Sequence, residues 1–500
     1  MITILTTTDF KPEIEQVISS IERLEELVVV VDKDDTINLQ NDFLIVQDHH
    51  IILPLDWHDT MPPYVFPNFD FSESRLLALL FLKLKNHQKA FEFVSEEDQV
   101  YSHLLITTHL QYGYELSDDM LAFAEKTSKH NLAIMYHYGI VKNPLAFDAL
   151  KNLYNSAIDA VENDELRVYT EKHYLNLLHD GGQIDEAKHL VESLKKKAIS
   201  DEAINALNVH LASIYTEQLK IPYDNDKLDE ILSLQLKSIA FYEAQQLKVN
   251  AGLVLTDAAE IANFKSDFIQ SKELINKAIQ YFRQEDIPEF LGEAGLKKAI
   301  LLYTWSKNGS PQYYKAAIAA FQDTLKVFKK DTYPKKFADV HHHLAMIYSE
   351  IPVTPEEKPI WTAFSASSFK NALEIFTKEE YPYEFAMASH NYATALMNFP
   401  PAKLHNNHDK ANDFFENALQ IRTAKKYPTE RALTLLNQLE LFWLTHNENE
   451  DEESKKFDEM VVKANQVKTL VNDAELIQQA NEQLNRLEAL KLQLESTNNK

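Results

Sequence analysis

The sequence predicts a mostly α protein, an α-solenoid of stacked helical hairpins that follows a small α/β cap at the N-terminus. Three observations lead to this fold class. Only eight of 500 residues are glycine, too few for the tight turns of sandwiches, barrels and phosphate-binding loops. Strong helix formers, mainly Leu, Ala, Lys, Glu and Gln, dominate the composition. A dipeptide that ends in proline recurs at nearly constant spacing in the second half of the chain.

Residues 1–71 differ from the rest and predict the α/β cap. A short strand is expected at residues 2–5. An amphipathic helix is expected from about Pro12, with one apolar face made of Ile14, Val17, Ile18, Ile21 and Leu24. Further short strands are expected at residues 27–31, 36–39, 43–46 and 50–54. Residues 61–71 contain three prolines, which oppose helix and most sheet pairing, so this stretch predicts an ordered connector.

The recurring dipeptide divides the later part of the chain into long repeats. It stands at Ile287-Pro288, Tyr333-Pro334, Tyr381-Pro382 and Tyr427-Pro428, at spacings of 46, 48 and 46 residues. Proline disfavours helix in the residue before it but is tolerated in the first turn of a helix, which needs no N–H donor. Each dipeptide therefore predicts the end of one repeat and the first helix of the next.

The residues before each proline also fall into register. Seventeen, thirteen and ten positions earlier, each repeat carries a small, a large and a small residue, which share one helix face. The three columns are Ser271, Ala317, Ser365 and Ala411; Ile275, Phe321, Phe369 and Phe415; and Ala278, Thr324, Ala372 and Ala418. Small residues let a neighbouring helix approach while the large residue fills the space between the helices. This pattern predicts a continuous core shared by stacked hairpins.

The small-large-small helix resembles the second helix of the tetratricopeptide repeat (TPR) family, and Leu344-Ala345-x-x-Tyr348 resembles the Leu-Gly-x-x-Tyr pattern of its first helix. The long units look like the TPR regions often joined to caspase-like protease domains, although the catalytic cysteine of those domains is absent here. We expect degenerate repeats at 72–265, long repeats at 266–446, and an acidic linker with a C-terminal capping helix at 447–500. The last helix has a near-heptad seam that either caps the array or pairs with a partner.

The amino-acid composition limits the classes of partner that the protein is expected to bind. The formal charge of −26 opposes binding to nucleic acid and favours a basic protein or peptide. The absence of cysteine excludes disulfides and thiolate metal sites, and it fits the cytoplasm. We expect no secretory signal and no membrane span, because the longest apolar run covers only residues 76–82.

One stretch offers an enzymatic alternative. In residues 27–37, an apolar strand followed by Asp-x-Asp-x-Thr resembles the first motif of haloacid dehalogenase-like phosphatases. That resemblance implies Asp32 as nucleophile and Asp34 as acid/base beside Mg²⁺. About 70 residues, however, are too few for the βαβ crossovers of that fold, and a hairpin turn with solvated aspartates is the alternative interpretation.

The candidate binding residues are His343, His390, Asn391 and Asn437. His343, Asn391 and Asn437 stand nine residues after their prolines, and His390 stands eight after, in line with His342. In the TPR family this helix lines the groove, where an amide can bond the backbone of an extended peptide. Polar contacts between adjacent repeats are an equally good interpretation. His341-His342-His343 cannot converge on one ion, because consecutive helical positions point about 100° apart, so no metal or cofactor is predicted.

The prediction is therefore a non-enzymatic protein- or peptide-binding scaffold or adaptor, whose oligomeric state the sequence leaves open. A regulatory switch that responds to a peptide is the first alternative, because repeats contact only their neighbours and can flex. The magnesium-dependent phosphatase is the second.

Overall fold

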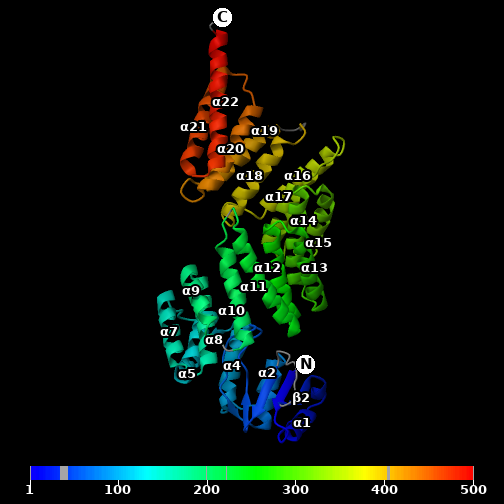
Figure 1. The fold of residues 1–500 in the computed structure, drawn as a ribbon, viewed down its shortest axis with the longest axis vertical. Coiled ribbons are helices and arrows are strands. Elements are labelled where there is room, and N and C mark those ends of the chain that lie inside the picture. Colours follow the sequence, from blue (N-terminus) through cyan, green and yellow to red (C-terminus); the bar gives the residue numbers. More distant parts are fainter. Residues whose placement is uncertain (1, 34–42, 199, 221, 402–405, 499–500) are drawn as a thin grey trace. The chain divides into compact units, whose positions relative to one another are not determined.

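The computed structural model describes residues 2–33, 43–198, 200–220, 222–401 and 406–498, and it confirms a mostly helical chain (Figure 1). The chain divides into two compact units after Asp286, and each is described by itself. None of the described helices is both long enough and apolar enough to cross a membrane.

The N-terminal cap is a five-stranded sheet with helix α1 (Lys11–Ser19) packed beside it. Its strands run in the order β2-β1-β3-β4-β5. They are β1 (Ile2–Thr6), β2 (Val28–Asp32), β3 (Phe43–Gln47), β4 (His50–Ile52) and β5 (Phe69–Asp70). β2 and β3 flank β1 and are parallel to it, whereas β4 and β5 add antiparallel pairs. The strand expected at residues 36–39 lies outside the described residues.

This topology corrects one expectation. β2 and β3 do not form a hairpin, because β1 lies between them. β1, α1 and β2 form one parallel crossover, whereas the several crossovers of a haloacid dehalogenase-like fold were expected to be too long for this region. A nine-residue helix is enough to return the chain, since each strand has only five residues.

The rest of the first unit is a stack of helices. They are α2 (Glu73–Lys83), α3 (His87–Phe91), α4 (Gln99–Tyr112), α5 (Asp118–Thr127), α6 (Lys129–Tyr138), α7 (Phe147–Ala160), α8 (Asp164–Asp180), α9 (Ile184–Leu194), α10 (Asp201–Glu217), α11 (Asn225–Ala244), α12 (Lys248–Phe264) and α13 (Phe268–Gln284). Short strands β6 (Glu115–Leu116) and β7 (Ile140–Val141) pair between α4 and α7. Helices α2 to α4 pack consecutively, as do helices α5 to α13, and α8 also contacts both α6 and α10. We call α4, α6, α8, α10 and α12 the even-helix row.

The second unit continues the helical hairpins with α14 (Pro288–Lys307), α15 (Tyr314–Thr324), α16 (Pro334–Glu350), α17 (Lys358–Leu373), α18 (Pro382–Met397), α19 (Asn407–Ile421), α20 (Pro428–Leu444), α21 (Glu450–Leu470) and α22 (Ala474–Asn498). All four junction prolines are the first residue of their helix, as predicted. The three tyrosines before them share one conformation, with ψ of 61° at Tyr333, 61° at Tyr381 and 62° at Tyr427. The repeat junctions therefore have one repeated geometry.

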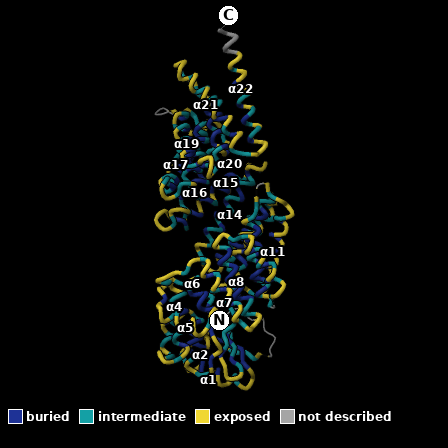
Figure 2. Tube along the Cα trace, turned by 90° about the vertical axis from the view of Figure 1, so that its left-hand side faces the viewer, coloured by how far each residue is buried: buried dark blue, intermediate teal, exposed yellow. Residues whose placement is uncertain are grey.

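The predicted repeat core is confirmed. All twelve residues of the small-large-small columns are buried. Figure 2 shows where buried and exposed stretches lie along the helices. The serines in the first small column also fasten the two helices of their hairpin. Ser365 Oγ donates to the Ala345 carbonyl at 2.7 Å, and Ser271 Oγ donates to the Ala259 carbonyl at 2.6 Å. These helices stack as TPR-like hairpins.

The C-terminal segment differs from the expected linker and single helix. The acidic run begins α21, where Asn449 accepts from the Asp451 and Glu452 amides and four acidic residues occupy the first turn. Carboxylates are favourable at this end of a helix because of its dipole. α22 contacts α20 and α21 and buries Leu476, Ala480 and Leu487.

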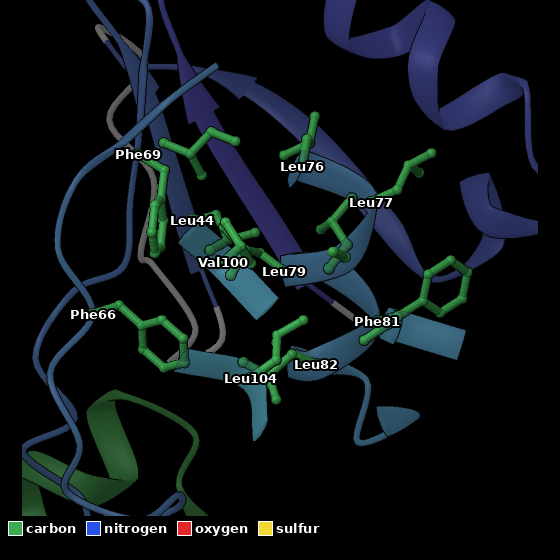
Figure 3. Packing of buried hydrophobic residues seen from close by; sticks show 14 of the residues in the cluster. Leu44, Phe66, Phe69, Leu76, Leu77, Leu79, Phe81, Leu82, Val100 and Leu104 are labelled. Atoms are coloured by element: carbon green, nitrogen blue, oxygen red, sulfur yellow. The ribbon is translucent and has the colours of Figure 1, made fainter. Parts of the chain in front are cut away.

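The cap and the first helices share one hydrophobic core. Leu44 of β3 belongs to the same buried cluster as Leu79 and Leu82 of α2 and Val100 and Leu104 of α4 (Figure 3). Phe66 and Phe69, from the chain between β4 and α2, close the side of this core. The cap is therefore joined to the helical stack by burial of apolar surface.

Candidate functional site

The chain between β4 and β5, residues 53–68, lies along the even-helix row of the first unit. We call it the connecting segment. Residues on α4, α6, α8 and α12 contact it in turn, through His103, Asn131, Tyr169 and Asn250. The contacting residues are 39 to 192 positions away in sequence. A connecting chain that includes a turn at residues 56–61 is thus bound by helices of several repeats.

The first part of this contact is made to the backbone of the connecting segment. The Val65 amide donates to Asn131 Oδ1 at 2.8 Å, and Asn131 Nδ2 donates to the Val65 carbonyl at 2.8 Å. His130 Nε2 donates to the Pro63 carbonyl at 3.2 Å. Burial lowers the pKa of His130 to about 4, so its ring is neutral at pH 7. These hydrogen bonds are made to main-chain N–H and C=O groups, which any extended peptide offers.

Aromatic rings anchor the same stretch. Tyr64 is buried, and its hydroxyl lies 2.8 Å from His103 Nδ1. Phe66 packs edge-on to Tyr64, with ring centroids 5.5 Å apart. Burial lowers the pKa of His103 to about 4 and raises that of Tyr64. Residues 63–66 are therefore held both by their backbone and by the core.

Residues 56–61 form a turn that is folded by its own side chain. The Asp56 carboxylate accepts from the His58 amide at 3.1 Å, the Thr60 hydroxyl at 2.9 Å and the Met61 amide at 2.7 Å. The helices hold its backbone at longer range. Tyr169 donates to the Asp56 carbonyl at 3.3 Å, and Asn250 donates to the His58 carbonyl at 3.4 Å.

An ion pair fixes the turn to α8. Lys172 Nζ lies 2.6 and 2.7 Å from the two carboxylate oxygens of Asp59. The lysine side chain is 1% exposed, whereas that of Asp59 is 55% exposed. A buried ammonium needs an anion beside it, because its desolvation is otherwise very costly. Lys172 therefore needs a carboxylate partner, and the partner can approach it from the solvent.

Two buried polar atoms around this turn, His58 Nδ1 and His173 Nε2, have no hydrogen-bond partner among the described residues. Burial lowers the pKa of His173 well below its usual value, and the nearby Lys172 lowers it further. Buried polar groups are normally satisfied. The contacts between the turn and the helices therefore leave buried polar atoms without hydrogen bonds.

Sequence reasoning identified this segment only as an ordered connector and did not assign it a binding face. The available signal was the count of nineteen histidines, because His103, His130 and His173 are buried on successive even helices. Neither the repeat pattern nor a known motif marks Asn131 or Lys172.

The four residues predicted for binding lie in the second unit. The structure brings two of them together, since Asn437 Nδ2 lies 3.3 Å from His390 Nε2 and 3.2 Å from Thr394 Oγ1. Asn391 Nδ2 reaches His342 Nε2 at 2.9 Å and Met346 Sδ at 3.5 Å. His343 instead stacks on Phe321, with centroids 5.4 Å apart. The asparagine N–H groups thus serve contacts between repeats, and ligand binding by the four residues stays a prediction.

The histidine cluster shows no metal geometry. Among the described residues, no group of three or more His, Asp and Glu side chains could hold an ion. Burial lowers the pKa of His342 to about 3 and those of His341 and His343 to about 4. These rings are neutral parts of the repeat core.

The phosphatase alternative gains no support from its surroundings. Asp32 ends β2, an edge strand, and accepts from the Thr8 hydroxyl. An edge strand has one neighbouring strand, so among the described strands of the sheet only β1 lies beside Asp32. Asp34 lies outside the described residues.

No family model and no curated protein matches the sequence. Among solved structures, the chain is similar to a signal-transduction ATPase with a tetratricopeptide repeat sensor from Pyrococcus horikoshii, at 12% identity over 99% of this chain and 82% of that one, with a TM-score of 0.44. It is also similar to the human IFIT1 dimer solved with PPP-AAAA (13% identity, 84% and 90% covered, TM-score 0.37) and to yeast Tom70 (13% identity, 84% and 96% covered, TM-score 0.21). Because the identities and TM-scores are this low, the assignment of TPR-like hairpins rests on the packed helices and the small-large-small columns described above.

Proposed function

We propose that the protein is a scaffold or adaptor that binds an extended segment of a partner protein on the even-numbered helices of its repeats, without a catalytic step. The observation that carries this proposal is the connecting segment. Residues 63–65 are bound on the first unit by side-chain bonds to their backbone, which is how a repeat array would hold a foreign chain.

In the second unit, the corresponding helices are α16, α18 and α20. The candidate column His343, Asn391 and Asn437 is half-buried there. Four residues earlier on each helix, on the same side, stand Asp339, Met387 and Leu433. Because both N–H groups of each asparagine serve the neighbouring repeat, a bound segment would meet the amide oxygens, which accept from backbone N–H groups. The overall charge of −26 favours a basic segment and opposes nucleic acid. The lack of cysteine favours the cytoplasm.

The test is a pull-down of the tagged chain from its native cells beside the double variant Asn391→Ala, Asn437→Ala. A stoichiometric partner that binds the parent and is lost from the folded variant would support the proposal. The matched control is Asn465→Ala with Asn472→Ala, which alters two exposed asparagines of the C-terminal region. The absence of any partner, or equal loss in both variants, would contradict the assignment.

A further inference from the structure

We infer that the even-helix row of the first unit is a second binding face, for a partner segment with an internal acidic residue, and that the turn at residues 56–61 occupies it as an internal ligand. This inference rests on the proposed function in one respect, namely that the even-numbered helices bind extended chain. It goes beyond that function by assigning a binding face on the first unit, a ligand with an internal carboxylate, and the turn at residues 56–61 as a competitor for that ligand.

The two parts of the connecting segment are held unequally. Residues 63–66 are bonded at 2.8 Å through Val65, and Tyr64 and Phe66 belong to the core shared with the cap. The turn has backbone bonds of 3.3 and 3.4 Å to the helices, near the limit for a hydrogen bond. The backbone of the turn is therefore held less tightly than that of residues 63–66. The Asp59–Lys172 ion pair and the buried Trp57 ring are the contacts that a competing segment would have to replace.

The turn is also built to move as one body. Asp56 bonds three groups of the turn itself, so these bonds persist when the helices release it. Asp59 adopts a positive φ of 53°, a left-handed conformation that aspartate tolerates better than most residues but that still costs more than extended backbone. A ligand with ordinary extended backbone at this position would not carry that cost.

The exposed helices would offer a defined chemistry. Lys172 is buried and requires an anion, while His173 Nε2 is buried and finds no hydrogen-bond partner among the described residues. Tyr169 lies beside the lysine, which stands 5.9 Å from its ring centroid, and it receives Trp57 edge-on at 5.1 Å. A carboxylate next to an aromatic residue fits this site, and a polar group of a neighbouring residue could satisfy His173 Nε2.

The carboxylate must come from an internal side chain. The chain passes through the site on both sides of Asp59, since Asp56 contacts α8 before it and Pro63 contacts α6 after it. A partner segment that follows the same path would place an internal Asp or Glu against Lys172. The resident turn competes at a high effective concentration because it is tethered. Binding in trans therefore requires a ligand that matches the site better, or loss of the resident carboxylate.

The experiment uses the full chain and a labelled synthetic peptide with the sequence of residues 54–62, PLDWHDTMP, measured by fluorescence anisotropy. In Asp59→Ala, the resident carboxylate is gone, and we expect the peptide to bind at least about tenfold more tightly than to the parent chain. A peptide with Asn at the position of Asp59 should lose about tenfold or more. Asp59→Ala with Lys172→Met should not bind it, provided that its circular dichroism matches the parent.

Equal binding to parent and Asp59→Ala, no binding to folded Asp59→Ala, or full binding of the Asn-containing peptide would overturn the inference. Dimers of Asp59→Ala that form by exchange of segments, without peptide binding, would likewise overturn it, because the occupant of the face would then be a second copy of this chain. Each of these results leaves the pull-down with Asn391→Ala and Asn437→Ala unaffected, so failure of this inference and failure of the proposed function are distinguishable.

Discussion

Asn131 and Val65 form a closed pair of hydrogen bonds, in which the side-chain amide of one residue matches the backbone N–H and C=O of the other at 2.8 Å each. The two residues are 66 positions apart. The bond pair fixes the path of the connecting segment over α6, so it defines where the N-terminal cap meets the helical stack.

Asn131→Ala should destabilise the first unit by about 1–3 kcal/mol for each backbone group left unpaired, because Asn131 itself is buried. Thermal melting measures this loss, and hydrogen exchange should become faster at residues 64–66. Asn155→Ala is the matched control, since Asn155 is exposed on α7. If both variants melt alike, the contact would contribute nothing to stability.

Substitution of Phe369 or Phe415 tests the predicted repeat core. Both rings are fully buried, and Phe369 stacks on Tyr392 with centroids 4.7 Å apart. Phe369→Ala or Phe415→Ala should cost about 3–5 kcal/mol of unfolding free energy, because each leaves a cavity between two hairpins. Denaturant titration checks this. Glu379→Ala, at an exposed position, should change stability little. A parental midpoint for the phenylalanine variants would contradict the repeat register.

The columns could be predicted from sequence because they depend on local spacing. Positions such as Ser365, Phe369 and Ala372 share a helix face wherever the helix lies, so periodicity suffices to place them in the core. Contacts between side chain and backbone, such as Asn131 with Val65 or Lys172 with Asp59, depend on the path of a chain far away in sequence. No periodic signal marks them, so the candidate face of the first unit could not be found this way.

The N-terminal cap shows what strand composition alone cannot predict. Strand composition located β1, β2, β3 and β4 approximately, but it could not decide their order, because short apolar strands pair equally well as hairpins or across a helix. The histidine and asparagine column was found by repeat alignment, and its contacts between repeats were one of two interpretations open from sequence. Only the three-dimensional arrangement shows that Asn391 reaches His342 and that His343 does not join them.

Gly292→Ala tests a close approach inside a hairpin. A Cβ at this position would lie 2.8 Å from the ring of Phe328, which is fully buried and cannot move freely. Alanine gains about 1 kcal/mol of helix propensity over glycine, whereas overpacking costs about 1–3 kcal/mol. We expect net destabilisation in a thermal melt. Gly182 has positive φ and open space around it, so Gly182→Ala separates a backbone effect from a clash. A stabilised Gly292→Ala would show that the ring adjusts easily.

Acid should destabilise the second unit before its carboxylates titrate. Burial lowers the pKa of His342 to about 3, and burial together with Arg422 lowers that of His390 to about 3. Unfolded histidine has a pKa of about 6.5. Below about pH 6.5 the unfolded chain therefore binds protons that the folded chain excludes, so stability is complete above this pH and falls as the pH is lowered toward 3.

Melting temperatures measured from pH 7.5 to 5.5 check this dependence. We expect a continuous fall across that range, and a shallower fall in the double variant His342→Gln, His390→Gln. Exposed carboxylates stay ionised over this range and contribute little. A flat profile, or an identical slope in the variant, would show that these rings are not kept neutral by the fold.

Arg422 interrupts a column of buried aromatic residues. Six positions before each junction proline stand Phe282, Phe328, Phe376 and then Arg422, and all four are buried. The Arg422 guanidinium donates to Thr434 Oγ1 at 2.8 Å and to the Glu430 carbonyl at 3.4 Å, and its Nε finds no partner among the described residues. No ion pair joins it to a carboxylate among the residues that the structure describes, and burial lowers its pKa.

Arg422→Phe should therefore stabilise the second unit by about 1–4 kcal/mol, because an uncompensated buried charge is replaced by the residue type that the other repeats use. The change leaves no orphaned partner, since the Thr434 hydroxyl also donates to the Glu430 carbonyl at 2.7 Å. Denaturant titration measures the gain. Arg486→Met removes an exposed arginine that pairs with Glu440, and it should change the midpoint little. A loss of stability in Arg422→Phe would mean that the guanidinium is needed where it stands, and the contact with Thr434 would then be the interaction to dissect by a double-mutant cycle.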